Sequence, residues 1–212
     1  MVGTHSTTIV LLLCDNNAVL SSPERAELIE RASAVPAYHG PDVRQVFHYS
    51  EDGSIRRFAP HVPQTNPGQP ASVWAIDHEH SPLYWFPRNC PRLSVWARGG
   101  GQQALLTELF ETEASRVCVA ETGWLQRVRD ARIYRYVFDA AAFHPWPEAD
   151  GQYVTHQVVR PDRVEPIDDV FELHASADIE LRFTPRLGAP MDRILASGLP
   201  FSFVRIRDAR RD

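Results

Sequence analysis

Cysteine is scarce in this sequence, and no two cysteines are spaced as a metal or redox pair. Cys14, Cys90 and Cys118 are odd in number, lie far apart and form no CxxC. A disulfide framework needs paired cysteines in an oxidising compartment, so this pattern indicates reduced thiols and a cytoplasmic protein. No base stands near Cys90 or Cys118 in the sequence, which argues against a nucleophilic thiol.

Long hydrophobic runs are absent as well. The apolar stretch at 9–14 lacks a basic leading region and ends at Asp15. A bilayer span needs about 20 apolar residues, so we expect neither a membrane segment nor a secretion signal. The stretch predicts a buried strand, followed by a helix that Ser22 caps and Pro23 begins. We therefore assign residues 1–42 to an N-terminal strand and helix extension.

The chain also lacks a strong charge excess and the common nucleotide-binding loops. Its net charge of −5 gives no basic footprint for duplex nucleic acid. Without GxGxxG, GxxxxGK(S/T) or GxSxG, the Rossmann, P-loop and hydrolase classes lack their defining turns. The three glycines at 99–101 form a single flexible turn before a helix and make a weak phosphate cradle.

What is present is the composition of a globular protein, with 43% hydrophobic and 10% aromatic residues. Alternation of the kind seen in "IELRF", where Ile179, Leu181 and Phe183 share one face, predicts strands at 43–49, 72–77, 92–97, 116–121, 132–138, 152–159, 179–184 and 201–207. Helices are predicted at 78–86, 102–111, 122–130, 168–176 and 190–197, each too short for a bundle. Residues 43–212 are therefore expected to form one α+β domain of mostly antiparallel sheets.

Two segments carry the chemically interesting residues. "VFHYSEDGSIRRF" at 46–58 sets His48 inside an apolar strand, and "SVWAIDHEHSPLYWFPRNCPR" at 72–92 gathers aromatic side chains around a short helix. These aromatics either fill a core or form a stacking wall for a flat ligand. Both interpretations apply to Trp74, Tyr84, Trp85 and Phe86.

Over about residues 43 to 208 the chain resembles an uncharacterised family of small bacterial proteins, through "VFHYSEDGSIRRFAPHVP", "VWAIDHEHSPLYWFPRNCPR", "RIYRYVFD" and "YVTHQVVRPDRVEPI". Its order of elements is more distantly similar to the ADP-ribosyltransferase fold, especially to rifampin ADP-ribosyltransferases and RNA 2′-phosphotransferases. That resemblance implies split sheets around a cleft, with NAD as the substrate.

The resemblance also implies site residues. The first-strand residues that meet the nicotinamide and ribose end of NAD correspond to His48, Tyr49 and Ser50, and the aromatic stacking position corresponds to Tyr84 or a neighbour. The strand that carries a catalytic Glu in many members has His156 and Gln157 here, and some branches of the fold work without that Glu.

Cleavage of the bond between nicotinamide and ribose builds positive charge on the sugar, so a site must orient hydroxyls and stabilise that charge. We expect His48 to bind a ribose hydroxyl and Gln157 to orient another, with His156 nearby. The remaining predicted ligand contacts are stacking of aromatic rings on the flat parts of the nucleotide and pairing of an arginine guanidinium with the diphosphate. They involve Trp74, Tyr84, Trp85 and Arg88.

Several alternatives stay open on the sequence alone. Arg88 also suits the C-terminal end of a helix, where a cation is favourable with the dipole, and His48 also suits a purely structural role. "DHEH" at 77–80 offers metal ligands that His48, His61 or His156 might join, but residues two apart on a helix point in different directions. We expect no metal site there.

Three functions are therefore compared. The first is an enzyme that transfers or hydrolyses the ADP-ribosyl group of NAD, with an unidentified acceptor. The second is an RNA 2′-phosphotransferase that needs basic groups such as Arg88 or Arg135. The third is a noncatalytic module that binds a small nucleotide.

Overall fold

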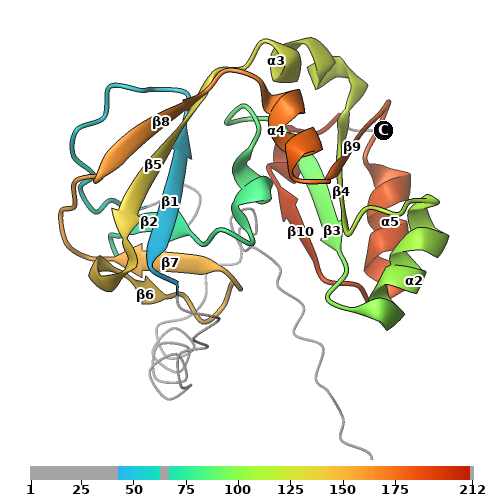
Figure 1. Cartoon of the computed structure of the whole chain (residues 1–212), viewed down its shortest axis with the longest axis horizontal. Helices are drawn as coiled ribbons and strands as arrows, with labels where there is room; N and C mark the ends of the chain where they lie inside the picture. Colours follow the sequence, from blue (N-terminus) through green and yellow to red (C-terminus); the bar gives the residue numbers. More distant parts are fainter. Residues whose placement is uncertain (1–42, 63–66, 211–212) are drawn as a thin grey trace, which may run out of the picture. The chain divides into compact units, whose positions relative to one another are not determined.

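The structure, a computed structural model, describes residues 43–62 and 67–210 (Figure 1). The extension predicted over residues 1–42, with Cys14 and the Ser22 cap, lies outside these residues. Contacts divide the described chain into two units, which are taken separately below. Residues 43–88 and 127–170 form the six-stranded unit, and residues 89–126 and 171–210 form the four-stranded unit.

The six-stranded unit is built on an antiparallel sheet in which β1 is an inner strand. The strand order is β6-β7-β2-β1-β5-β8. β1 pairs with β5 along its whole length but with β2 only where Phe47 lies opposite Ile76. The strands are β1 (Gln45–Ser50), β2 (Val73–Ile76), β5 (Ile133–Asp139), β6 (His144–Pro145), β7 (Gln152–Thr155) and β8 (Arg163–Ile167).

One face of this sheet packs on its own core, and Tyr136 holds a loop over that core. Val46, Tyr136 and Phe138 belong to a cluster of buried side chains against which Phe58 packs. The buried Tyr136 hydroxyl donates to the Asp52 carbonyl at 2.5 Å and accepts from the Ile55 N–H at 3.2 Å. Two hydrogen bonds from one side chain thus fasten the loop after β1 to the middle of β5.

The four-stranded unit has the order β10-β3-β4-β9, with only the β4 and β9 pair parallel. Leu93 and Val95 lie two residues apart in one strand, so their side chains project from the same face of the sheet. There they belong to one buried cluster with Leu106 and Ile194, which come from two helices. The strands are β3 (Arg92–Trp96), β4 (Arg116–Glu121), β9 (Glu180–Thr184) and β10 (Phe201–Val204), and the helices with these apolar contacts are α2 (Gly100–Phe110) and α5 (Gly188–Ser197).

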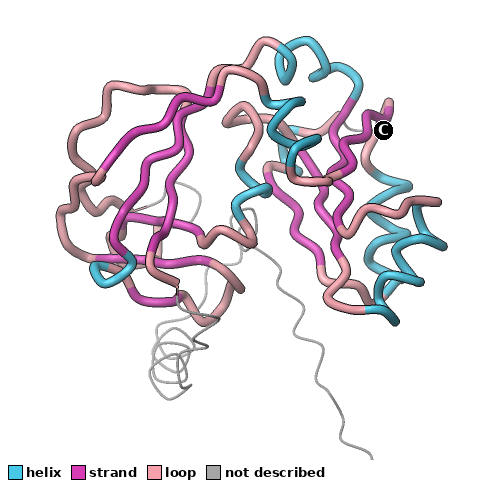
Figure 2. Tube along the Cα trace, viewed as in Figure 1, coloured by secondary structure: helices cyan, strands magenta, loops and turns pink. Residues whose placement is uncertain are grey.

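The remaining helical segments are short, as the cyan segments of Figure 2 show. They are the 3-10 turns η1 (Ser81–Tyr84), η2 (Thr122–Trp124), η3 (Ala140–Ala142) and η4 (Ile206–Asp208), and the helices α3 (Leu125–Arg129) and α4 (Val170–Ser176). Among the described residues, no helix has both the length and the apolar character that crossing a membrane requires.

The α+β class with mostly antiparallel sheets is confirmed. Each of the eight predicted strands overlaps an observed one, although the strand expected at 152–159 ends at Thr155. The helix predicted at 78–86 is wrong, because only the 3-10 turn η1 forms there. Proline lacks a backbone donor and disfavours the helical conformation of the residue before it. Pro82 therefore interrupts a helix that begins at residue 78, and Pro87 prevents one that begins at Pro82 from continuing.

Two strands were not predicted. β6 has only two residues, and β8 contains Pro166, which lowers strand propensity except at a sheet edge. β8 does lie at an edge of the sheet.

A buried histidine fixes the turn that leads from β2 into η1. His80 is only 3% exposed, and its Nδ1–H donates to both carboxylate oxygens of Asp77, at 2.9 and 3.0 Å. The Asp77 N–H donates to the Gly151 carbonyl at 2.9 Å, which ties this turn to the start of β7. Gly151 has φ 77°, and a Cβ there would stand 2.1 Å from the His80 ring. The position therefore requires glycine both for its conformation and for its contact.

Replacing the Tyr136 hydroxyl tests the loop attachment. Tyr136→Phe leaves the Asp52 carbonyl and the Ile55 N–H without their partner, so we expect the free energy of unfolding in urea to fall by about 1–3 kcal/mol. Tyr134→Phe, on the neighbouring position of the same strand, is the control and should change it by less than about 0.5 kcal/mol. Equal effects of the two substitutions would contradict the assignment.

Replacing Gly151 tests the turn. Gly151→Ala combines a strained φ with a collision against a buried ring, so we expect a loss of about 2 kcal/mol or more in thermal or urea unfolding. Gly123→Ala is the matched control, because a Cβ at that position meets nothing within 4 Å. A neutral Gly151→Ala would mean that His80 moves aside freely.

Candidate functional site

The strand β1 sends its predicted site residues to opposite faces of the sheet. Successive residues of a strand alternate, so His48 and Ser50 share the face of the Tyr136 core, where His48 lies opposite Tyr136 in the register. Phe47 and Tyr49 project from the other face. The structure therefore does not bring His48 together with Tyr49 in one site.

His48 acts as a tie between β1 and β2. Its Nδ1 lies 2.9 Å from the Trp74 carbonyl oxygen, and its ring meets Phe58 edge to face at 5.0 Å. Since a carbonyl only accepts, Nδ1 carries the proton. Burial lowers the pKa of His48, the bond to Trp74 opposes that shift, and the charges of Arg88 and His61 lower the pKa further. The ring is thus held in its neutral form, in the place where backbone pairing between β1 and β2 has ended.

Ser50 and Arg88 have local contacts at the end of β1. The Ser50 hydroxyl accepts from the Asp52 N–H at 3.1 Å, which shapes the turn after the strand. Arg88 is exposed, and its backbone N–H donates to Glu51 Oε2 at 3.1 Å. Ser50 projects from the face of the sheet opposite to Tyr49.

The Tyr49 face carries a cluster of polar and aromatic groups. We call Phe47, Tyr49, Trp85, Arg135 and Glu165 the Tyr49 cluster. The Tyr49 hydroxyl is buried and makes no hydrogen bond of good geometry with a described residue. Burial raises the pKa of Tyr49, while Ser81, Trp85 and Arg135 lie near enough to act in the opposite direction. An unsatisfied buried hydroxyl costs about 1–3 kcal/mol, so this atom is ready to accept or donate a bond.

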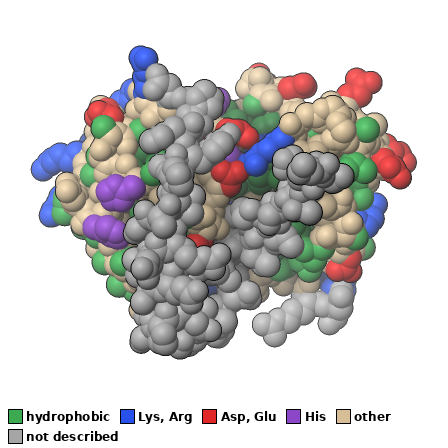
Figure 3. Space-filling view, turned by 90° about the horizontal axis from the view of Figure 1, so that it is seen from below, with side chains coloured by type: hydrophobic (Ala, Val, Ile, Leu, Met, Phe, Trp, Pro, Cys, Tyr) green, Lys and Arg blue, Asp and Glu red, His purple; other side chains and the backbone are tan. Residues whose placement is uncertain are grey.

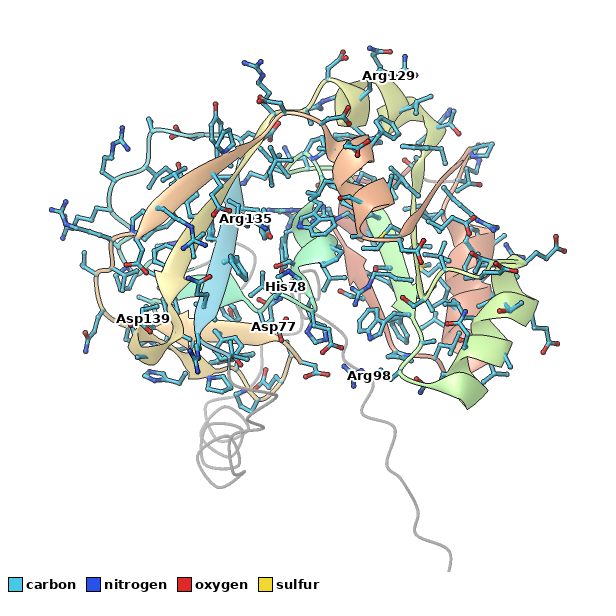
Figure 4. The ribbon with its side chains drawn as sticks, in the orientation of Figure 1. Asp77, His78, Arg98, Arg129, Arg135 and Asp139 are labelled. Carbon is cyan, nitrogen blue, oxygen red and sulfur yellow. The ribbon has the colours of Figure 1, made fainter. Side chains whose placement is uncertain are left out.

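Arg135 lies between Tyr49 and a carboxylate, opposite Tyr49 in the register with β1 and opposite Glu165 in the register with β8. Its Nε and Nη2 both lie 2.5 Å from Glu165 Oε2, and its Cζ lies 5.5 Å from the centre of the Phe47 ring. His78, labelled with Arg135 in Figure 4, meets the Phe47 ring at 6.1 Å.

Glu165 is shared between two arginines. Arg163 Nε donates to its Oε1 at 2.6 Å. Burial pushes the pKa of Glu165 upward, but the hydrogen bonds and charges of Arg163 and Arg135 outweigh it and hold the pKa below its ordinary value. The carboxylate therefore stays ionised near neutral pH. Two guanidinium groups and one carboxylate leave a local charge of +1, which favours an anionic ligand.

The other predicted aromatic residues are packed rather than open. Trp74 meets Trp146 at 5.2 Å in an edge-on contact. The Tyr84 hydroxyl accepts from Gln152 Nε2 at 3.0 Å, and Trp85 is only 5% exposed. Of these residues, Trp85 belongs to the Tyr49 cluster.

His156 and Gln157 follow the end of β7 and are both exposed. His156 Nδ1 lies 2.9 Å from the Ala71 carbonyl, and the Gln157 N–H donates to Thr155 Oγ1 at 3.3 Å. Because β2 separates β7 from β1 in the sheet, these residues are not neighbours of Tyr49.

Sequence reasoning named Arg135 only as a possible phosphate contact and missed Glu165. A signal was present: in "RVEPI" the charged Arg163 and Glu165 stand two apart, as they do on one face of a strand. Their partnership with Arg135 depends on the register of β5 and β8, in which Arg135 lies opposite Glu165.

A separate cavity of about 760 Å³ opens near the start of β1. It contains none of the predicted site residues and is lined by Val43, Arg44, Gln45, Asp139, Ala140, Ala141, Phe143, Pro145, Tyr153 and Asp162. In the part of the chain that the structure describes, no group of three or more His, Cys, Asp or Glu side chains is arranged to hold a metal ion.

Fold and site together define an α+β protein whose antiparallel sheet carries a cationic, aromatic cluster on one face. A family model matches residues 47–209, and the chain belongs to that family, described as a family of unknown function (DUF6886). No curated protein and no solved structure matches the chain.

The lowered pKa of His48 predicts a pH-dependent stability. The unfolded chain takes up a proton near the ordinary pKa of about 6.5, whereas the folded protein resists it, so the free energy of unfolding falls as the pH drops below that value. His48→Asn keeps a donor near the Nδ1 position and removes the titration. We expect this variant to lose less stability than the wild type between about pH 7.5 and pH 5 in urea unfolding.

The exposed His144 supplies the control. His144→Asn should keep the pH dependence of the wild type, whereas an unchanged slope in His48→Asn would contradict a buried, neutral His48.

Proposed function

We propose that the protein binds NAD or a related nucleotide at the Tyr49 cluster and transfers or hydrolyses its ADP-ribosyl group. The observation that carries the proposal is the buried Tyr49 hydroxyl, which makes no hydrogen bond of good geometry with a described residue and lies near the guanidinium of Arg135, which itself pairs with the ionised carboxylate of Glu165. As part of the same proposal, the pair of mostly antiparallel sheets is assigned to an ADP-ribosyltransferase-like fold, and the reaction is assigned to the cytoplasm.

The charges of the cluster suit the diphosphate of such a ligand. The Arg135 guanidinium, whose side chain is 29% exposed, has planar N–H donors of the kind that bind phosphate oxygens with charge-assisted hydrogen bonds. The Tyr49 hydroxyl supplies a further donor. Both groups extend from neighbouring strands, because Tyr49 lies opposite Arg135 in the β1 and β5 register. Rigid strands hold the two donors at a fixed spacing.

The carboxylate suits the chemical step. When the bond between ribose C1′ and the nicotinamide nitrogen breaks, its electron pair leaves with nicotinamide and positive charge develops on the sugar. Glu165 is kept ionised by its two arginines. With the diphosphate bound to the guanidinium groups and offsetting their charge, the carboxylate is the anionic group of the cluster that can stabilise the positive charge on the sugar. Because its pKa is lowered, it is a weak proton acceptor, and its assigned role is charge stabilisation. His48 has no role in this proposal beyond supporting β1.

An RNA 2′-phosphotransferase is the second candidate, because the net positive charge around Arg135 also fits a terminal phosphate. It differs from the first in its substrate requirement. Such an enzyme consumes NAD only together with an RNA that carries a 2′-phosphate, whereas the first function releases nicotinamide from NAD without that acceptor. A noncatalytic module would bind the nucleotide and release nothing.

Tyr49→Phe separates binding from folding. Because the hydroxyl makes no hydrogen bond of good geometry with a described residue, its removal should leave the free energy of unfolding unchanged or slightly raised. The loss of its bond to the ligand should weaken NAD binding about tenfold. We would measure NAD affinity by calorimetry and stability by urea unfolding. A Tyr49→Phe variant that is destabilised, and that binds NAD as the wild type does, would overturn the assignment.

Substitution of the charged residues tests the site and the reaction. Arg135→Gln should weaken NAD binding about tenfold or more, while Arg132→Gln, an exposed arginine of the same strand region, should not. Glu165→Gln should keep NAD binding and lose nicotinamide release, followed by chromatography. Absence of any NAD or ADP-ribose binding by the wild type would refute the proposed function, and binding without release would identify the noncatalytic module.

A further inference from the structure

We propose that His144 and His156 form a binding site for a divalent transition-metal ion on the six-stranded unit. The site is independent of the Tyr49 cluster. It differs from the "DHEH" segment considered from the sequence, where His80 is buried and already held by Asp77. The argument rests on the position, exposure and orientation of the two imidazoles.

The sheet register brings the two histidines to the same face. His144 of β6 lies opposite Val154 of β7, and His156 follows Val154 by two residues, so both side chains project from one side of the sheet. Diagonal neighbours of this kind lie within reach of long or aromatic side chains. The ring centres are 6.2 Å apart with planes inclined at 45°.

That separation is compatible with a shared ion. A zinc ion lies about 2.0–2.1 Å from each imidazole nitrogen, which places the centres of two coordinating rings roughly 4.5 to 5 Å apart at angles of about 90° to 110° at the metal. Binding therefore requires the two rings to approach each other by about 1 Å, which rotation of the exposed His144 side chain allows. Both side chains are exposed, so the ion can reach them without opening the fold. Histidine side chains, drawn purple, are also visible at the surface in the view from below in Figure 3.

The hydrogen bond of His156 orients its free nitrogen. Nδ1 lies 2.9 Å from the Ala71 carbonyl. Because that oxygen only accepts, Nδ1 is the protonated nitrogen and Nε2 keeps its lone pair. Metal-binding histidines are held in this way, with the second ring nitrogen donating to a carbonyl or carboxylate. The hydrogen bond to Ala71 therefore sets the tautomer and the ring orientation of His156 before any ion binds.

Two imidazoles select the class of ion. Nitrogen ligands suit zinc, nickel and copper, whereas calcium and magnesium prefer oxygen. Binding should follow the order of divalent ions in which copper exceeds nickel and zinc. With two protein ligands, water fills the remaining positions, so an incoming ligand with a nitrogen or oxygen donor can replace it.

Calorimetric titration of the tag-free full chain with Zn²⁺ and Ni²⁺ tests the site. His144→Gln should weaken the affinity of the site about tenfold or more, and the doubly substituted His144→Gln, His156→Gln protein should lose it. His78→Gln is the matched control, an exposed histidine outside the pair, and should bind as the wild type does. Mg²⁺ should not compete.

Two further measurements keep the test decisive. Urea unfolding must show that His144→Gln folds as the wild type does, since the only ring contact of His144 named above is with His156. In nuclear magnetic resonance spectra, Zn²⁺ should shift the imidazole signals of both residues together in the wild type and should leave the remaining histidine signals of the double variant unmoved. Equal affinity in the wild type and the double variant, or shifts confined to other histidines, would overturn the proposal.

Discussion

The alternation of side chains along β1 is the constraint on which the six-stranded unit depends. β1 is an inner strand with a neighbour on each side, so both of its hydrogen-bonding edges are occupied and its side chains project from the two faces of the sheet. One face delivers Val46 and His48 to a packed core, and the other delivers Phe47 and Tyr49 to a polar and aromatic cluster. A shift of one residue in register would exchange the two sets. The full pairing of β1 with β5 prevents that shift and also places Tyr49 beside Arg135.

The strands were predictable because their signals are local. β4 has the bounds expected from the sequence, and the alternation in "IELRF" marks β9. The turn at η1 was mistaken for a longer helix because its aromatic residues and its start resemble one, although two prolines close together limit it. β8 was missed because Pro166 interrupts the usual strand composition. Local composition therefore identifies regular elements and fails where a tertiary position, such as a sheet edge, overrides propensity.

The candidate site was less predictable, because its members meet through the register of the sheet. The rule of alternation, applied to "FHYS", already separates His48 from Tyr49. That Arg135 touches both Tyr49 and Glu165 follows only from the pairing of β5 with β1 and with β8. The hydrogen bond between His48 and the Trp74 carbonyl is likewise nonlocal. A histidine in an apolar strand is thus explained by a backbone acceptor that no sequence pattern displays.

Both outer strands of the six-stranded sheet contain a proline, Pro145 in β6 and Pro166 in β8. Such strands expose backbone groups to which a strand of another molecule can add, and proline removes a donor from that row. On β8 the charges of Arg163 and Glu165 add a further obstacle to stacking. Both edges of the six-stranded sheet are consequently poor templates for a strand of another molecule, which disfavours growth of this sheet into an intermolecular fibril.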